Sequence, residues 1–323
     1  MTLTQLRYFV AIVDSGLNIT QAAERVHATQ PGLSKQIKQL EEELGVLLFN
    51  RGGRSLDALT PAGREILERA RRMLAEADNI RAFAANQRGE TDGSLTVVTT
   101  HTQARYVLPG PVSALKHAFP GLSLHLEPAG DAEVMERLRS GEADLALLSS
   151  VGAPPEGGLA VPLFRWQRLV LVPRGHALAE AGVAPDLAAL AGFPLVSYES
   201  SLRPESSLRR AFEAAGFQPE IAVTARDADL IKTYVRTGLG VGILAEMALL
   251  ESDQDDLVAL PAPAALPECT AWAVLPPQRV VRDYTLQLLL GLAPWLDRHD
   301  LKRTLSGAQA ADWPTPPRWR RPV

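Results

Sequence analysis

The sequence is poor in cysteine and in long apolar runs. Its 323 residues include one cysteine, Cys269, and no cluster of cysteines and histidines at metal-ligand spacing. A single cysteine excludes an internal disulfide, so we expect a reducing compartment and no bound metal or cofactor. No apolar stretch approaches the roughly 18 residues of a membrane span, and the first residues lack the basic and apolar segments of a signal peptide. The sequence therefore predicts a soluble, cytoplasmic protein without a membrane partner.

Basic residues are not in excess either, because 33 lysines and arginines face 37 aspartates and glutamates. Any surface that binds nucleic acid must then be a local patch rather than a property of the whole chain. The sequence also shows no nucleophile beside a base and no catalytic pair of carboxylates, so we expect no enzyme. A chain of this length with 46% hydrophobic residues fits two domains.

Helical periodicity dominates the first part of the chain. Apolar residues recur three and four positions apart, which predicts three helices with breaks near residues 15–18 and 27–29. Pro31 falls in the first turn of the third helix, where its missing N–H costs nothing. The apolar positions are Leu6, Phe9, Val10, Val13, Ala22, Ala23, Val26, Leu33, Ile37, Leu40 and Leu44.

A short hairpin and a long helix follow. Residues 49–56 contain a Gly-Gly turn flanked by two arginines, a pattern typical of a wing. Thr60 and Pro61 then provide a cap and a first-turn proline for a helix that extends to about Gln87. Its narrow apolar stripe is that of a helix that pairs with another helix, so we expect dimerisation.

Beyond a polar hinge at residues 88–93, short apolar runs alternate with helical segments. This alternation predicts an α/β effector domain of two doubly wound subdomains. The last residues are rich in proline, tryptophan and arginine without periodicity, so we expect a disordered tail. The predicted boundaries are residues 1–59 for an all-α winged helix-turn-helix domain, 60–88 for the dimerisation helix, 89–305 for the effector domain (93–165 with 268–305, and 166–267) and 306–323 for the tail.

The apolar runs of the effector domain are candidate strands. Each is short and bounded by turn residues, and helical segments lie between them. The candidate strands cover residues 94–99, 122–128, 145–149, 169–172, 195–197, 221–224 and 241–244.

The start of the third predicted helix carries side chains suited to DNA. Gln30 can pair with adenine, while Ser34 and Lys35 can reach base edges or phosphates. Alternatively, these residues form the solvated face of a plain helical bundle. The cap, wing and long helix, in this order, favour a DNA-binding module. The candidate DNA contacts are Thr29, Gln30, Pro31, Ser34, Lys35, Lys38, Arg51 and Arg54.

With these residues in place, the N-terminal segment resembles the LysR-type transcriptional regulators. Residues 99–106 and 224–236 extend the resemblance and are similar to the CysB-like branch of that family. The N-terminal likeness rests on residues 3–9, Ala22, Ala23, Thr29, Gln30, Pro31, Ser34, Gln39, Leu40, Glu41, Leu44, Gly45, Leu48, Phe49, Arg51 and residues 59–63.

The resemblance implies a homotetramer, a dimer of dimers, that binds promoter DNA upstream of sulfur-assimilation genes, with RNA polymerase as a further partner. It also implies an effector domain like a type 2 periplasmic binding protein, with acetylserine, sulfide, thiosulfate or sulfate as ligand. Regulators of sulfonate and nitrogen assimilation share much of the pattern, so the regulated genes stay open among these pathways.

Polar residues follow the first candidate strand of the effector domain. Thr100, Thr102 and Gln103 offer neutral hydrogen-bonding groups at the carboxyl end of a strand, where α/β domains bind ligands. A helix that begins there favours an anion. The alternative is plain strand-end capping. The resemblance implies that these three residues and Ser149 contact the ligand directly.

The second subdomain is expected to contribute Ser201, Arg203 and Thr224 to the effector site. The resemblance implies a hydroxyl residue at the position of Arg203, where this sequence has a guanidinium. A guanidinium favours a carboxylate or sulfate but changes the volume of the pocket. The sequence therefore predicts an anionic effector and leaves its identity open.

Other classes of protein explain only part of the chain. A solute-binding module accounts for residues 94–300 but not for the DNA-binding segment, and a nucleoid-type DNA protein accounts only for that segment. We expect Asp227, Asp229 and Lys232, at the start of a helix, to cap that helix and to bind loops between the subdomains. His101 is expected to be a packed or surface residue.

Overall fold

The computed structural model describes residues 1–52 and 55–320, and the predicted DNA contact Arg54 lies outside them. The chain separates into two compact units, Met1–Gly89 and Glu90–Val323, which are described in turn. Within the described residues, no helix combines the length and apolar character needed to cross a membrane.

Helices and a hairpin form the first unit. Leu6, Phe9, Leu33 and Phe49 are buried together, and the rings of Phe9 and Phe49 meet edge to face with 5.4 Å between centroids. The apolar positions repeat at helical spacing because each helix turns one face to this core. The elements are α1 (Leu3–Asp14), α2 (Ile19–Arg25), α3 (Gln30–Leu44), β1 (Phe49–Gly52), β2 (Ser55–Leu59) and α4 (Pro61–Gln87).

A close backbone approach fixes the start of α4. Thr60 caps the helix by accepting a hydrogen bond from the N–H of Gly63 at 2.8 Å, and it donates to the carbonyl of Leu47 at 2.6 Å. A Cβ atom at Gly63 would lie 2.1 Å from the carbonyl oxygen of Leu48, so only glycine fits there. The segment before β1 and the first turn of α4 are therefore held together.

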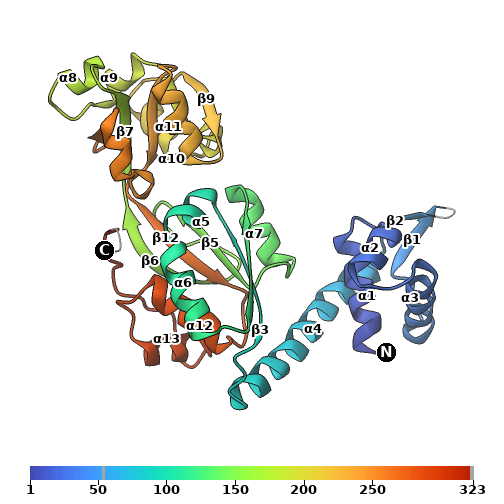
Figure 1. The fold of residues 1–323 in the computed structure, drawn as a ribbon. Helices are drawn as coiled ribbons and strands as arrows, with labels where there is room; N and C mark the ends of the chain where they lie inside the picture. Colours follow the sequence, from blue (N-terminus) through green and yellow to red (C-terminus); the bar gives the residue numbers. More distant parts are fainter. Residues whose placement is uncertain (53–54, 321–323) are drawn as a thin grey trace. The chain divides into compact units, whose positions relative to one another are not determined.

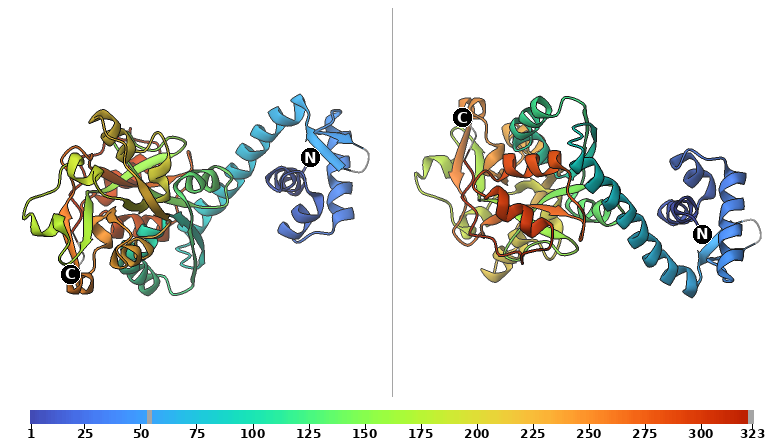
Figure 2. Two further views of the ribbon diagram at one scale, coloured as in Figure 1. Left: turned by 90° about the horizontal axis from the view of Figure 1, so that it is seen from above. Right: turned by 90° about the horizontal axis from the view of Figure 1, so that it is seen from below.

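The apolar stripe of α4 divides into a buried and an exposed part. Leu67 and Ala70 pack into the core of the unit, whereas Met73, Ile80 and Phe83 are 45%, 65% and 58% exposed. Figures 1 and 2 show α4 as one continuous helix. Exposed apolar side chains on a long helix form a surface that another helix can cover.

The second unit contains two subdomains, each built on a β-sheet. The first sheet has the strand order β4-β3-β5-β12-β6, and β3 is parallel to both neighbours while β12 is antiparallel to both of its own. Helices α6 and α12 pack on one face and α7 on the other (Figure 1). The elements are β3 (Gly93–Thr99), α5 (His101–Tyr106), α6 (Pro109–Ala118), β4 (Leu122–Pro128), α7 (Asp131–Arg139), β5 (Leu145–Ser150), β6 (Leu159–Trp166), β12 (Cys269–Leu275), α12 (Asp283–Leu292) and α13 (Arg298–Leu305).

The second subdomain repeats this plan with the strand order β11-β7-β10-β8-β9. Helices α8, α9 and α10 pack on one face of the sheet and α11 on the other. The elements are β7 (Arg168–Pro173), α8 (Ala177–Glu180), α9 (Leu187–Ala191), β8 (Leu195–Tyr198), η1 (Glu199–Leu202), α10 (Ser207–Ala214), β9 (Ile221–Ala225), α11 (Ala228–Arg236), β10 (Val241–Ala245), η2 (Glu246–Ala248), η3 (Glu251–Asp255) and β11 (Leu257–Pro261).

These two α/β subdomains confirm the predicted fold class, although the sequence did not predict β6, β11 and β12. Strand β6 contains Pro162, and its pairing with β12 shifts register at this residue. Proline weakens the pattern of a strand and is tolerated at a sheet edge, which is the position of β6. The missed strands connect the subdomains, because the chain passes from β6 to β7 and returns from β11 to β12.

The C-terminal segment packs against the first subdomain as far as it is described, which corrects the expectation of a disordered tail. The N–H of Arg165 donates to the carbonyl of Pro317 at 2.8 Å, and the N–H of Trp319 donates to the carbonyl of Arg165 at 2.6 Å. The Trp319 ring also lies 4.7 Å from that of Phe164. Periodicity gave no sign of this order, because the segment pairs with the free edge of β6.

Candidate DNA-binding surface and effector cavity

The candidate DNA contacts of the first unit gather at the start of α3. Thr29 caps the helix by accepting a hydrogen bond from the N–H of Gly32 at 3.3 Å, and Ser34 is half-buried. The opposite face of α3 is buried in the core, so the polar face is free to approach DNA as a recognition helix does. The exposed residues on this polar face are Thr29, Gln30, Pro31, Lys35 and Lys38.

Arg51, predicted as a DNA contact on the wing, also has a structural partner. Its guanidinium lies 2.7 Å from Oε2 of Glu41, whose side chain is 4% exposed. The other oxygen of Glu41 accepts hydrogen bonds from the N–H groups of Leu48 at 2.8 Å and Phe49 at 3.4 Å. This buried carboxylate joins α3 to β1, and Arg51 compensates its charge.

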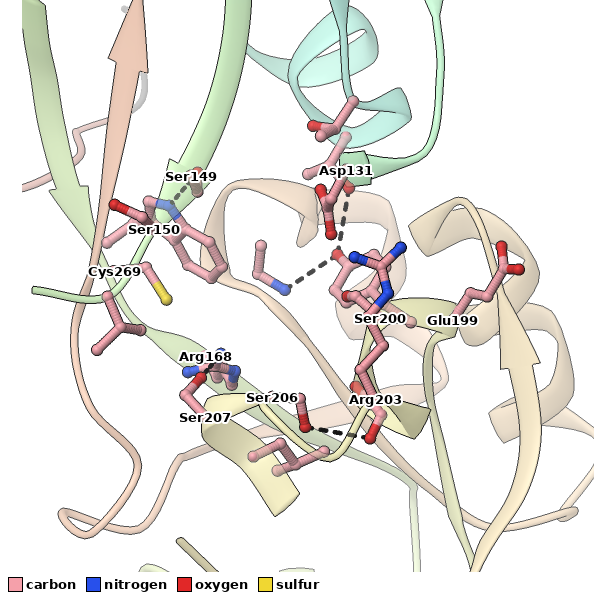
Figure 3. Close-up of a pocket in the computed structure, with 18 of the residues that line it drawn as sticks. Asp131, Ser149, Ser150, Arg168, Glu199, Ser200, Arg203, Ser206, Ser207 and Cys269 are labelled. Carbon is pink, nitrogen blue, oxygen red and sulfur yellow. Dashed lines mark hydrogen bonds between the residues drawn. The ribbon is translucent and has the colours of Figure 1, made fainter. Parts of the chain in front are cut away.

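A cavity of about 670 Å³ lies between the two subdomains of the second unit and is drawn in Figure 3. This volume suits a small molecule. Thr224 does not line it, although the next residues, Ala225 and Arg226, do. The predicted effector contacts that line the cavity are Thr100, Thr102, Gln103, Ser149, Ser201 and Arg203.

Ser149 is held by two neighbouring side chains. Its Oγ accepts hydrogen bonds from Nε2 of Gln103 at 3.1 Å and from Nε1 of Trp166 at 3.0 Å. A hydroxyl has two lone pairs and one proton, so both acceptor positions are occupied. The Ser149 proton is therefore the group that remains for a ligand, and it favours an anion or another acceptor.

Tyr198, which sequence reasoning missed, also has both acceptor positions of its hydroxyl oxygen occupied. Its phenol oxygen accepts hydrogen bonds from Oγ1 of Thr102 at 3.3 Å and from the N–H of Ala245 at 3.2 Å. Burial raises the pKa of Tyr198, so its own O–H stays protonated and can donate. Thr102 thus acts by orienting this donor. Thr100 makes no side-chain cap at the start of α5, which argues against plain capping there.

Ser201 is engaged within its own subdomain. Its Oγ lies 2.9 Å from that of Ser197, and Ser197 donates to the carbonyl of Ile243 at 3.1 Å. Because the Ser197 proton is used, Ser201 must donate to Ser197 and offers an anion no proton. The expectation that Ser201 binds the effector is therefore weakened, whereas Arg203 faces the cavity in Figure 3.

Fixed charges on the cavity wall were also missed from sequence. Arg168 donates to Oγ of Ser207 at 2.7 Å and to the carbonyl of Pro267 at 3.1 Å, which fixes its guanidinium at the wall. Burial raises the pKa of Asp131, against smaller lowering effects of Ser200 and Arg203. In the sequence, Arg168 is only a basic residue between two strands, and Asp131 is only an acidic residue at the start of a helix. Neither pattern alone predicts that the residue lines a cavity.

The two subdomains are joined beside the cavity by a charged cluster. The Tyr106 hydroxyl donates to Oδ1 of Asp229 at 2.7 Å, and Arg105 lies 2.5 Å from the other oxygen. Lys232, only 2% exposed, lies 2.9 Å from Asp229 and 2.8 Å from Asp253. Burial raises the pKa of Asp229, but the hydrogen bonds from Tyr106 and Lys232 lower it by more. The pKa of Asp229 is therefore below its ordinary value. The prediction that Asp229 binds across the subdomains is confirmed.

A winged helix-turn-helix unit together with a two-lobed α/β unit around a polar cavity defines a class of protein, the DNA-binding regulators that respond to small molecules. The family model of the lysR-type bacterial regulatory helix-turn-helix proteins matches residues 3–64, and that of the LysR substrate binding domain matches residues 88–291. The chain belongs to the LysR family of transcriptional regulators.

Individual relatives point to one branch of this family. The chain is 41% identical over 255 residues, 79% of each protein, to the HTH-type transcriptional regulator CysB of Haemophilus influenzae. It is 34% identical to the regulator cbl of Escherichia coli K12 over 94% of this chain and 96% of that protein. The cofactor-binding domain of the Cbl transcriptional regulator superposes with a TM-score of 0.61 at 34% identity, over 67% of this chain and 95% of that structure. Both relatives are transcriptional regulators.

Proposed function

We propose that this regulator controls genes of sulfur assimilation or cysteine biosynthesis in response to a small anionic or amino-acid-like effector such as acetylserine, sulfate or thiosulfate. The observation that carries the effector proposal is the pair of free protons on Ser149 and Tyr198 beside the guanidinium of Arg168. Donors fixed in advance suit the oxygens of an acid group. The similarity to CysB and Cbl supports the sulfur-related genes.

On DNA, α3 enters the major groove of promoter DNA with Gln30, Ser34 and Lys35 at base edges and Lys38 at phosphates. Thr29 and Pro31 start the helix and bring its N–H groups near a phosphate. Arg51 contacts the flanking backbone from the wing with the half of its side chain that is exposed (48%).

The exposed apolar side chains of α4 support dimerisation. Met73, Ile80 and Phe83 pack against the same helix of a second copy, which places two recognition helices on one operator. Dimers then pair into a homotetramer, and RNA polymerase is a further partner at the promoter. Effector binding changes the closure of the two subdomains and so changes how the dimers engage DNA.

A second candidate function is regulation of sulfonate or nitrogen assimilation through a different effector. Arginines of the cavity wall, Arg168 and Arg203 among them, favour this candidate, since they supply more fixed positive charge than a neutral hydroxyl pocket. A larger or doubly charged acid fits such a pocket better than a small neutral ligand.

The test measures the thermal midpoint of the full chain with acetylserine, sulfate and thiosulfate, alongside its affinity for DNA from upstream of sulfur-assimilation genes. We expect a saturable rise in the midpoint with one of these ligands, because a ligand that binds the native state stabilises it. The rise should disappear in Ser149→Ala. It should persist in Ser150→Ala, because the Ser150 hydroxyl already donates to Ala153 and accepts from Trp272. A wild-type chain that binds none of this DNA would contradict the proposed regulated genes.

A further inference from the structure

The cavity wall carries charges of both signs on opposite sides. Asp131 is the first residue of α7 in the first subdomain, and Arg168 is the first residue of β7 in the second. Figure 3 shows the two on different parts of the wall, and Tyr198 and Cys269 line the same cavity. The charges of Arg168 and Asp131 both act on the Tyr198 phenol and on the Cys269 thiol, so they border the same volume.

Asp131 and Glu199, the two acidic residues labelled in Figure 3, differ in their cationic partners. Glu199 has a cationic partner, because its Oε2 lies 2.9 Å from Nε of Arg226. Asp131 interacts with the hydroxyl of Ser200 and with the charge of Arg203, and among the described residues no basic side chain forms an ion pair with it. Burial also raises the pKa of Asp131, which indicates that its charge is poorly compensated. A half-buried carboxylate without an ion-pair partner is a group that a cationic ligand can satisfy.

A second set of groups on the wall suits an acid group. Arg168 is fixed by Ser207 and Pro267, and Ser149 and Tyr198 each direct a proton that no protein acceptor uses. A ligand that met only this part would leave Asp131 uncompensated. A simple oxyanion such as sulfate would in addition bring a second negative charge toward it, which is unfavourable at low dielectric.

We propose that Asp131 binds an ammonium group of the effector while Arg168, Ser149 and Tyr198 bind its acid group, so that the effector is an amino acid with a free ammonium group. This inference rests on the proposed function only in that it takes the cavity as the effector site. Asp131 is then the residue that selects free amino acids over N-acylated amino acids and inorganic oxyanions.

The experiment compares the affinity of the full chain for pairs of compounds that differ in a free ammonium group. The pairs are O-acetyl-L-serine with N-acetyl-L-serine, and L-aspartate with succinate, and binding is measured by calorimetry. We expect at least one ammonium-bearing compound to bind at least about tenfold more tightly than its partner, since a hydrogen bond between charged groups is strong once water is excluded.

Variants assign this preference to one carboxylate. Asp131→Asn keeps the shape of the side chain and should abolish the preference. Asp131→Ser keeps a residue that suits a helix start and gives an independent second variant. The matched control is Asp186→Asn, because Asp186 caps α9 outside the cavity and accepts a hydrogen bond from Ala189. The control should keep the full preference.

Each result decides the proposal. A preference in the wild type that both Asp131 variants lose supports it. Equal affinities within both pairs, tighter binding of the N-acylated or ammonium-free compound, absence of binding by every ammonium-bearing compound, or a preference that survives in Asp131→Asn would overturn it. The last result would mean that another group in the cavity recognises the ammonium group. DNA affinity is measured on the same samples, so a failure of the proposed gene regulation is read separately.

Discussion

The recognition surface on α3 and the effector cavity use polar side chains in different ways. Gln30, Lys35 and Lys38 lie on one helix, exposed to solvent. In the cavity, Ser149 and Tyr198 come from different subdomains, and each is already held by two hydrogen-bond donors. Side chains on the first surface should therefore act almost independently, whereas those of the cavity should act as a network.

The two regions also differ in how far their carboxylates are compensated by neighbouring groups. Glu41 of the first unit is compensated by two backbone N–H groups and by Arg51. Asp131 of the cavity has the hydroxyl of Ser200 and the charge of Arg203, with no ion pair among the described residues. A fully compensated carboxylate stabilises the fold around it, whereas a poorly compensated one lowers stability and is available to a ligand.

The largest expected effect concerns the compensated carboxylate. Glu41→Ala removes the partner of Arg51 and leaves the N–H groups of Leu48 and Phe49 without their acceptor. We expect the free energy of unfolding of the first unit to fall by about 3–5 kcal/mol, because each unsatisfied buried N–H costs about 1–3 kcal/mol, and denaturant titration measures this change. Glu42→Ala is the matched control, because Glu42 is 64% exposed and should change stability very little. If Glu41→Ala and Glu42→Ala lowered stability equally, Glu41 would not be a stabilising, compensated carboxylate.

The next effect tests the network of the cavity. Arg168→Met keeps the length of the side chain and removes its charge, so the affinity for the effector should fall by about 2–5 kcal/mol. Calorimetry gives the affinity, and DNA binding without effector should not change. Arg174→Met serves as control, since Arg174 donates to backbone carbonyls of residues 254 and 255 outside the cavity. A loss of DNA affinity in Arg168→Met would mean that the two sites share a network.

The third effect tests independence on the recognition surface. Lys35→Ala should weaken binding to promoter DNA by about tenfold and reduce the slope of log affinity against log salt by about one. Titrations at several salt concentrations measure both quantities. Effector affinity should stay the same, as should DNA affinity in the control Lys302→Ala on α13. A slope that does not change would argue against a phosphate contact of Lys35.

The smallest effect concerns the cluster that joins the subdomains. Tyr106→Phe removes the hydrogen bond to Asp229 and should lower the free energy of unfolding by about 1 kcal/mol near neutral pH. The pKa of Asp229 is lowered from 3.8 in the folded protein, so its stabilisation is complete above that value and is lost as the pH falls through the lowered pKa.

This pH dependence gives the measurement for Tyr106→Phe. Unfolding curves between about pH 6 and pH 2 should show a smaller acid-dependent loss of stability in the variant than in the wild type. Tyr234→Phe is the control, because Tyr234 is 37% exposed on α11 and should leave the profile unchanged. Identical profiles for Tyr106→Phe and the wild type would show that Asp229 does not depend on Tyr106.

Local patterns predicted much of this protein. The helices of the first unit, the start of α4 at Thr60 and Pro61, and strands β3, β4, β5, β7, β8, β9 and β10 follow from periodicity, caps and turns. The position of Thr100, Thr102 and Gln103 at a strand end also led to the cavity. Periodicity did not predict β6, because Pro162 interrupts it, or the packing of Trp319, because that segment has no period of its own.

The sequence by itself determined which surfaces are apolar, where helices and strands begin, and the family that these patterns define. Tertiary structure decided the partners of polar groups. It placed Glu41 beneath Arg51, used the proton of Ser201 on Ser197, and brought Asp131 and Arg168 to one cavity from opposite subdomains. The physical reason is the separation along the sequence over which each interaction acts. Periodicity and caps depend on neighbours within a few residues, whereas hydrogen bonds and charges inside the protein depend on groups brought together by chain crossings that no local pattern records.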